Sequence, residues 1–197
     1  MDMRKTFTVA IVGVFLVFTL VGISAAADTI KLGVAGPHSG DLASYGIPTV
    51  RAAENIVKKV TAKGGVMGKQ VELLVEDDVC KPEIATNTAT KLASEGADVV
   101  LGHICSGATK AALGIYKGAK KIAMSPSAPN PALTQSGDYP NFYRTIASDD
   151  AQAQLEVDIA LNNWKAKTIA VLHDNGDYGK GLAECAKSFL EKDPRAA

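Results

Sequence analysis

The chain has 197 residues, of which 47% are hydrophobic, and its 21 Lys and Arg residues balance 21 Asp and Glu residues. This length and apolar content suit one buried domain, or one domain with part of a second. The balanced charge excludes the basic surface of a nucleic-acid-binding protein, so we expect no nucleic-acid partner.

The first 27 residues predict a cleavable signal peptide. Arg4 and Lys5 make a short positive start, residues 6–27 carry no charge, and the small residues at 24–27 suit signal peptidase. A retained membrane anchor is the alternative, because 22 uncharged residues are long enough to span a bilayer. Cleavage removes two basic residues and one acidic residue, which leaves 170 residues with a net charge of −1.

Strand-like and helix-like segments alternate along the rest of the chain. Short apolar runs predict strands, whereas apolar residues that recur every three or four positions predict helices. The expected strands are 30–34, 71–75, 98–101, 122–124 and 168–172, and the expected helices are 45–63, 81–95, 108–120, 150–162 and 178–191. A loop with one turn at 131–133 is expected over 126–140. This alternation indicates an α/β fold, a doubly wound parallel sheet with helices on both faces.

The last expected strand–helix unit, 168–191, has no obvious partners earlier in the chain. We therefore expect residues 28–145 to form one domain and residues 146–197 to begin a second domain that the chain leaves incomplete. No internal repeat accompanies this division.

The stretch 102–131 is the strongest candidate for a binding site. Two expected strands end there in small hydroxyl residues, at Ser106 and at Ser125 and Ser127, each just before a helix or turn. Ligands of open parallel sheets lie at the carboxyl ends of the strands, and free N–H groups at a helix N-terminus favour anions. The stretch therefore predicts a crevice for a small anionic group such as a carboxylate, with Tyr45 placed to overhang it.

Two glycine-rich stretches lack the spacing of nucleotide sites. Residues 64–69 run from a helix to a strand, the reverse of a phosphate loop, and predict a turn. Residues 33–40 form either a plain loop or a source of N–H donors for a ligand. The stretch 173–181 also leaves two interpretations open, a capped turn or a turn from which Tyr178 reaches into a cleft between two domains.

The residue pattern does not support an enzyme, a metal site or a cofactor site. Cys105 and His103 are close in sequence, but no acid that would orient the histidine is evident. The three histidines of the sequence lack metal-ligand spacing, and no G-x-S-x-G elbow is present.

Export affects the interpretation of the three cysteines. An oxidising compartment permits disulfides, and a bridge between Cys80 and Cys105 is possible because both follow neighbouring expected strands. Cys185 lies on the apolar side of the last expected helix, which favours a buried position over a reactive thiol.

Six sequence segments resemble those of a known protein family, and they occur in the same order and at the same spacing as in that family. They are IKLGVAGPHSGDLASYG, TAKGGVMGKQVELLVEDDVC, GHICSGAT, SPSAPNPALT, YRTIASDDAQ and IAVLHDNGDYGKGLA. From Thr29 to about Glu191, the chain resembles the periplasmic substrate-binding proteins of branched-chain amino acid ABC transporters. The resemblance implies two α/β lobes that close on a ligand, a periplasmic location and a monomer. It also implies that an amino acid or related carboxylate is delivered to a membrane permease.

The resemblance assigns roles to particular residues. It implies a Cys80–Cys105 disulfide, a ligand carboxylate contact from Ser106, backbone contacts from Ser127 and Ala128, and aromatic covers from Tyr45 and Tyr178. With the second lobe incomplete, we expect ligand binding by the chain alone to be weak or absent.

Two features depart from the family pattern. Pro129 stands where the amino-acid binders usually carry Thr, and proline offers neither a hydroxyl nor an N–H group. The acidic residue that holds the ligand ammonium in the family has no counterpart in this sequence. These departures leave a ligand-sensing module of the same fold, binding an amide or aromatic carboxylate, as the alternative function.

Overall fold

Five parallel strands form the centre of the structure, a computed structural model that describes residues 29–196. The order of the strands in the sheet is β2-β1-β3-β4-β5. Their bounds are β1 Ile30–Gly36, β2 Val71–Asp77, β3 Val99–Leu101, β4 Ile122–Ser125 and β5 Phe142–Arg144. The expected signal peptide, residues 1–27, lies outside the described residues.

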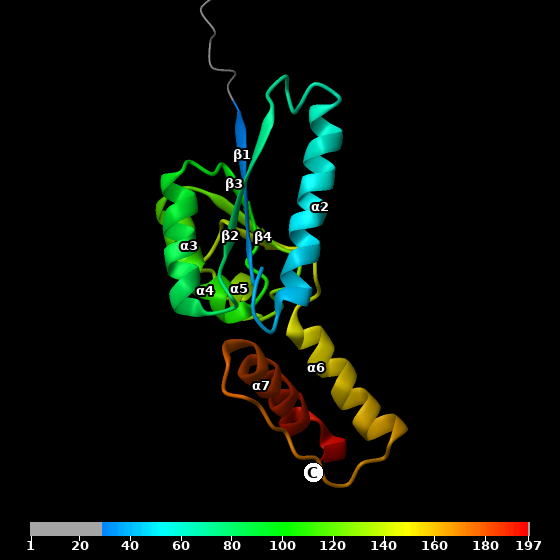
Figure 1. Cartoon of the computed structure of the whole chain (residues 1–197). Coiled ribbons are helices and arrows are strands. Elements are labelled where there is room, and N and C mark those ends of the chain that lie inside the picture. Colours follow the sequence, from blue (N-terminus) through cyan, green and yellow to red (C-terminus); the bar gives the residue numbers. More distant parts are fainter. Residues whose placement is uncertain (1–28, 197) are drawn as a thin grey trace, which may run out of the picture.

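Helices cover both faces of this sheet, which confirms the predicted fold class (Figure 1). Helix α2 (Ala43–Thr61) lies on one face, whereas α3 (Pro82–Ser94) and α4 (Ser106–Gly118) pack side by side on the other. Pro82 opens α3 at a position where its missing N–H is not needed, and Gly96 follows the helix with a φ of +82°.

The main core lies between the sheet and the pair α3 and α4. Its fully buried members include Ala35, Val100 and Ala123 from the strands and Leu92, Leu113 and Tyr116 from the helices. Helix α2 covers the opposite face of the sheet less completely than α3 and α4 cover theirs. A Cβ atom at Gly46 would lie 2.0 Å from the carbonyl oxygen of Pro37, so only glycine allows α2 to approach the loop that follows β1.

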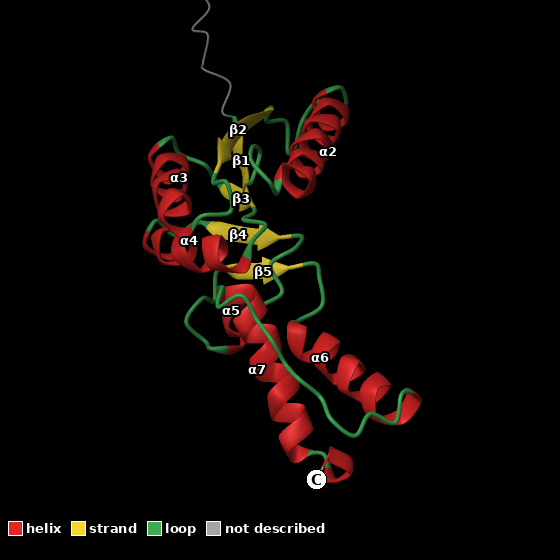
Figure 2. Cartoon of the chain, turned by 60° about the horizontal axis from the view of Figure 1, so that its bottom comes forward, coloured by secondary structure: helices red, strands yellow, loops and turns green. Residues whose placement is uncertain are grey.

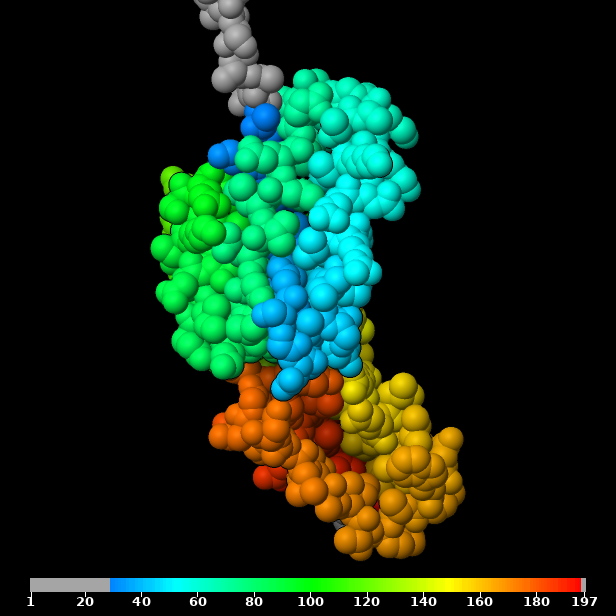
Figure 3. Space-filling view, in the orientation of Figure 1, coloured from blue at the N-terminus to red at the C-terminus, as the bar shows by residue number. Residues whose placement is uncertain are grey.

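Residues 149–196 form a helical hairpin. In Figure 3 this hairpin is the yellow to red part below the blue and green sheet domain. Helix α6 (Asp149–Asp158) continues into a π-helical turn (Ile159–Asn163) and packs against α7 (Asp177–Lys192), which a 3-10 turn (Pro194–Ala196) follows. Between them lie the buried side chains of Ala153, Val157, Leu161 and Ala186. Cys185 is partly buried against this cluster, and burial raises the pKa of its thiol, as expected for an apolar position. Across residues 29–196, no helix has the length and apolar character needed to cross a membrane.

Two predictions of secondary structure are wrong. Residues 168–172 are not a strand, and the side chain of Leu172 is 89% exposed. A strand needs hydrogen bonds from a neighbouring strand, and none of the strands of the described sheet pairs with this segment. Conversely, residues 142–144 form β5 because β4 pairs with them, although three residues are too few to show a strand period in the sequence.

Candidate functional site

The loops that follow β1, β3 and β4 emerge at the same edge of the sheet, because all the strands are parallel. Short helix α5 (Ala132–Gln135) and the hairpin of α6 and α7 lie beyond this edge, next to β5 (Figure 2). The sheet thereby gathers the predicted residues of the 102–131 stretch at one end of the molecule.

Ser106 occupies the first turn of α4 and is buried, with 1% of its surface exposed. Its Oγ accepts a hydrogen bond from the backbone N–H of Asn130 at 3.3 Å. The first N–H groups of a helix have no partner within the helix, and the helix dipole favours negative charge there. Ser106 therefore joins an anion-favouring helix end to the loop after β4.

Ser125, at the end of β4, organises the loop that follows it. Its Oγ donates to the carbonyl of His103 at 2.5 Å and accepts hydrogen bonds from the N–H groups of Ser127 at 3.2 Å and Ala128 at 2.9 Å. Ser127 and Ala128, to which the resemblance assigns backbone contacts with the ligand, thus already use their N–H groups within the protein. Ser125 fixes the shape of the loop, a role that the sequence did not reveal.

The carbonyl groups of the same loop are also engaged. Arg144 donates to the carbonyl of Asn130 at 2.8 Å and, more weakly, to that of Ala128 at 3.5 Å. The carbonyl of Pro129 accepts a hydrogen bond from the backbone N–H of Asp149 at 3.0 Å. The loop is therefore a rigid, internally bonded wall that also touches the start of α6.

Tyr45 on α2 and Tyr178 on α7 both remain open to solvent, with exposed fractions of 64% and 45%. Burial is the first cause that raises the pKa of Tyr178, followed by the negative charge of Asp149 and a smaller effect of Tyr45. The side chain of Gln152 opposes this rise in the pKa of Tyr178. The two tyrosines are thus within electrostatic range of each other, although they lie more than 130 positions apart in sequence.

Asp149 is the feature of this site that the sequence did not reveal. Its side chain is buried, with 1% of its surface exposed, and both carboxylate oxygens lack a hydrogen-bond partner among the described residues. Burial raises the pKa of Asp149 to about 6; Arg144 opposes this shift, whereas Glu156 and Asp150 add to it. In the sequence, an acid in the first turn of a helix is indistinguishable from an ordinary favourable end charge.

The Cys80–Cys105 disulfide is present, with a Cα–Cα distance of 5.6 Å. The bond removes Cys105 as a free thiol nucleophile. The expectation that no acid accompanies His103 is wrong, because Asp78 Oδ2 lies 2.5 Å from His103 Nδ1 and the Tyr116 hydroxyl lies 3.0 Å from Nε2. These three side chains are buried below the disulfide and bond to one another, so they stiffen the loops that carry the cysteines.

The glycine-rich stretches act as structural turns. In the 33–40 loop, the N–H of His38 and the hydroxyl of Ser39 bind the carboxylate of Asp77 at 2.8 and 2.5 Å. In the 64–69 stretch, Val66 and Lys69 bond to each other across the predicted turn. In the part of the chain that the structure describes, no group of three or more His, Cys, Asp or Glu residues is arranged to hold a metal ion.

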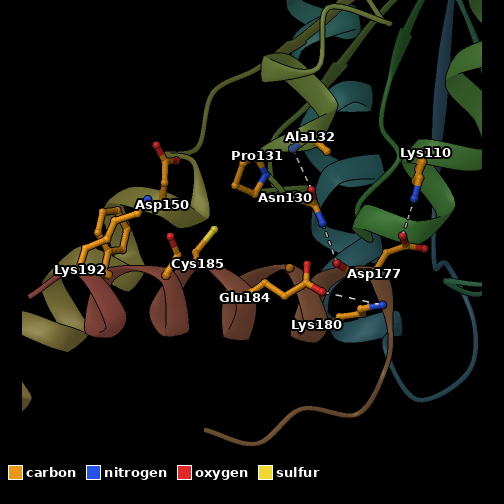
Figure 4. A pocket seen from close by; sticks show the side chains of 13 residues that line it. Lys110, Asn130, Pro131, Ala132, Asp150, Asp177, Lys180, Glu184, Cys185 and Lys192 are labelled. Carbon is orange, nitrogen blue, oxygen red and sulfur yellow. Dashed lines mark hydrogen bonds and ion pairs between the residues drawn. The ribbon is translucent and has the colours of Figure 1, made fainter. Parts of the chain in front are cut away.

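A cavity of about 520 Å³ lies between the α4–α5 end of the sheet domain and α7 (Figure 4). Asp177 connects its two sides, since its carboxylate accepts from Lys110 Nζ at 2.9 Å and its carbonyl accepts from Asn130 Nδ2 at 2.7 Å. The lining residues are Lys110, Asn130, Pro131, Ala132, Asp150, Asp177, Lys180, Gly181, Glu184, Cys185, Ser188, Phe189 and Lys192. None of the six predicted ligand residues is among them, so this cavity and the predicted crevice are different places.

Comparisons with known proteins agree with this architecture. The family model described as "Periplasmic binding protein" matches residues 29–193. The chain is 39% identical over 168 residues to the leucine-, isoleucine-, valine-, threonine- and alanine-binding protein of Pseudomonas aeruginosa, covering 85% of this chain and 45% of that protein. It is 36% identical to the Leu/Ile/Val-binding protein of Escherichia coli K12, with coverage of 85% and 46%.

A solved structure gives the same result. The chain is similar to the branched-chain amino acid transporter substrate binding protein LivJ from Streptococcus pneumoniae, which was determined in complex with isoleucine. The TM-score is 0.73 and the identity 31%, over 82% of this chain and 46% of that one. The chain therefore spans less than half the length of these relatives.

Proposed function

We propose that this chain, which belongs to the periplasmic binding protein family, binds a small amino acid for import by an ABC transporter. A branched-chain amino acid is the first candidate, since the named relatives bind leucine, isoleucine and valine. One observation carries the proposal: buried Ser106 opens α4 at the carboxyl edge of the sheet, directly beside the loop after β4.

The roles of the individual residues follow from this position. Ser106 and the first N–H groups of α4 receive the ligand carboxylate, and the backbone at Ser127 and Ala128 lines the same wall. Tyr45 and Tyr178 cover the ligand from α2 and α7. Pro129 contributes shape alone, because proline has no N–H group to donate. The match to binding proteins favours this function over a sensing module or an enzyme.

The wider organisation is part of the proposal. Residues 28–145 form the first lobe and residues 146–197 belong to the second, so that Tyr45 and Tyr178 come from different lobes. The protein is exported to the periplasm, acts as a monomer and presents its ligand to the membrane permease subunits of the transporter.

Ligand-dependent stability tests this function. The chain, expressed with its own leader and purified from the periplasm, should melt at a higher temperature in millimolar L-leucine, because a ligand that binds only the folded state stabilises it. Ser106→Ala should weaken leucine binding about tenfold, which corresponds to the loss of one hydrogen bond to a charged group.

The matched control is Ser188→Ala, which removes a hydroxyl from the cavity of Figure 4 and should leave leucine binding unchanged. A melting temperature that responds to none of leucine, isoleucine and valine, both in this chain and in a version that carries a complete second lobe, would contradict the proposed function. A shift produced only by aromatic acids would favour the sensing alternative.

A further inference from the structure

Three buried side chains beneath the candidate site bond to one another and make none of the proposed ligand contacts. His103 Nδ1 lies 2.5 Å from Asp78 Oδ2, and His103 Nε2 lies 3.0 Å from the hydroxyl of Tyr116. None of the three residues has exposed surface, so a ligand cannot reach them. Any effect of this network on binding must therefore pass through the atoms that it holds in place.

The network fixes the imidazole ring of His103 from both sides. A ring with its proton on Nδ1 donates to the carboxylate of Asp78 and accepts at Nε2 from the hydroxyl of Tyr116. Burial raises the pKa of Tyr116 above its ordinary range, so the hydroxyl keeps the proton that it donates. Asp78 is itself held, because its Oδ1 accepts a hydrogen bond from the N–H of Cys80 at 2.7 Å.

The main chain of His103 links this network to the loop after β4. Its carbonyl accepts hydrogen bonds from Ser125 Oγ at 2.5 Å and from Thr109 Oγ at 3.2 Å. A hydroxyl group has one proton to donate and two lone pairs that accept. Because the proton of Ser125 goes to His103, its oxygen accepts from the N–H groups of Ser127 at 3.2 Å and Ala128 at 2.9 Å.

We propose that His103 is a positioning residue for the ligand wall, by which we mean the backbone of residues 127–128. Its ring is held by Asp78 and Tyr116, and its carbonyl orients the Ser125 hydroxyl that shapes this wall. The inference rests on the proposed function, because the wall can position a ligand only if one binds there. It extends that function to buried residues that touch no ligand.

Amide hydrogen exchange, measured by NMR on the ¹⁵N-labelled periplasmic chain, tests this role without a ligand. Tyr116→Phe removes one hydroxyl from the far end of the network and keeps the aromatic ring in the core. The N–H of Ala128 is compared with that of Val100, a buried residue of the middle strand β3. A general loss of stability would speed exchange at Val100 at least as much as at Ala128, whereas loss of positioning speeds exchange at Ala128.

We expect Tyr116→Phe to raise the ratio of the Ala128 rate to the Val100 rate at least about threefold. Ser125→Ala removes the acceptor itself and should raise the ratio about tenfold. If the effect passes through Ser125, adding Tyr116→Phe to Ser125→Ala should raise the ratio no further. Circular dichroism confirms that each variant is folded.

Tyr139→Phe is the matched control, because Tyr139 packs against the same core but is not a partner of the His103 ring. It should leave the ratio unchanged. In the version that carries a complete second lobe, Tyr116→Phe should weaken leucine binding about threefold, and Tyr139→Phe should not.

An unchanged exchange ratio in Tyr116→Phe would overturn the positioning role of His103 while the proposed function stands. An equal effect of Tyr116→Phe with and without Ser125→Ala would do the same, as would unchanged leucine affinity in Tyr116→Phe. Failure of the wild type with a complete second lobe to bind leucine would overturn the proposed function, and the role of His103 in binding with it.

Discussion

Loss of the Cys80–Cys105 disulfide is expected to lower the free energy of unfolding by about 3–4 kcal/mol. The bond closes a loop across 25 positions of sequence and joins the loop after β2 to the start of α4. The cross-link limits the conformations of the unfolded chain, and its removal restores them. Because Cys105 precedes Ser106, the bond also holds the helix end at which we place the ligand carboxylate.

Urea unfolding with and without dithiothreitol measures this effect. The midpoint of wild-type unfolding should move to a lower urea concentration in dithiothreitol. The double variant Cys80→Ser/Cys105→Ser should unfold at that lower urea concentration with or without dithiothreitol. Cys185→Ser is the matched control, since Cys185 is a free thiol and its removal should leave the response to dithiothreitol intact. A wild-type midpoint that does not respond to reductant would contradict the prediction.

Replacing Asp149 with Asn is expected to stabilise the ligand-free protein by about 3 kcal/mol at pH 7.5. The folded state raises the pKa of Asp149 from 3.8 to about 6, so it binds the proton more tightly than the unfolded state does. The stability that this proton contributes is complete below pH 3.8 and is lost as the pH rises through about 6. Asparagine resembles the protonated acid and avoids that loss.

The pH dependence of the stability change distinguishes the charge of Asp149 from other causes of stabilisation. The groups that act on Asp149 are Arg144 on β5, which lowers its pKa, and Asp150 and Glu156 on α6, which raise it; the carboxylate in turn acts on Tyr178 of α7. Urea unfolding should show a gain for Asp149→Asn at pH 7.5 that shrinks toward zero at pH 4. An equal change at both pH values would show that the charge is not the cause.

Asp150→Asn is a control for which we expect a stability change of the opposite sign. Hydrogen bonds from Ser148 and Gln135 lower the pKa of Asp150, so its ionised form favours the folded state. That contribution is present above the pKa of the unfolded state and is lost as the pH falls. Removal of this charge should therefore destabilise the protein slightly at pH 7.5, the reverse of the result expected at the adjacent position.

Much of the fold was predictable from sequence because its strands are short apolar runs between helices of regular period. Strands β1 to β4 and the helices α2, α3, α4, α6 and α7 lie close to their expected positions. The failures have one physical origin, which is that a strand depends on its neighbour. Residues 142–144 form a strand because β4 binds them, and residues 168–172 do not, because no described strand pairs with them.

The candidate site was predictable in part, for a related reason. That Ser106 and the loop after β4 lie together could be predicted because strand ends in a parallel sheet meet at one edge. The internal bonds of Ser125 and the burial of Asp149 depend on how the 126–131 loop, β5 and α7 pack together. Sequence spacing carries no information on that packing, so the burial of the Asp149 carboxylate became visible only in the structure.

We propose that an aliphatic amino acid binds at the carboxyl edge of the sheet, between Ser106 and the loop after β4. Titration of the ¹⁵N-labelled periplasmic chain with L-leucine tests it most directly, because amide shifts locate the contact. The largest saturable changes should occur at the amides of residues 106–108, 127–130 and 149–150. Shifts confined to the cavity of Figure 4, at Lys180, Glu184 and Ser188, would contradict this binding position.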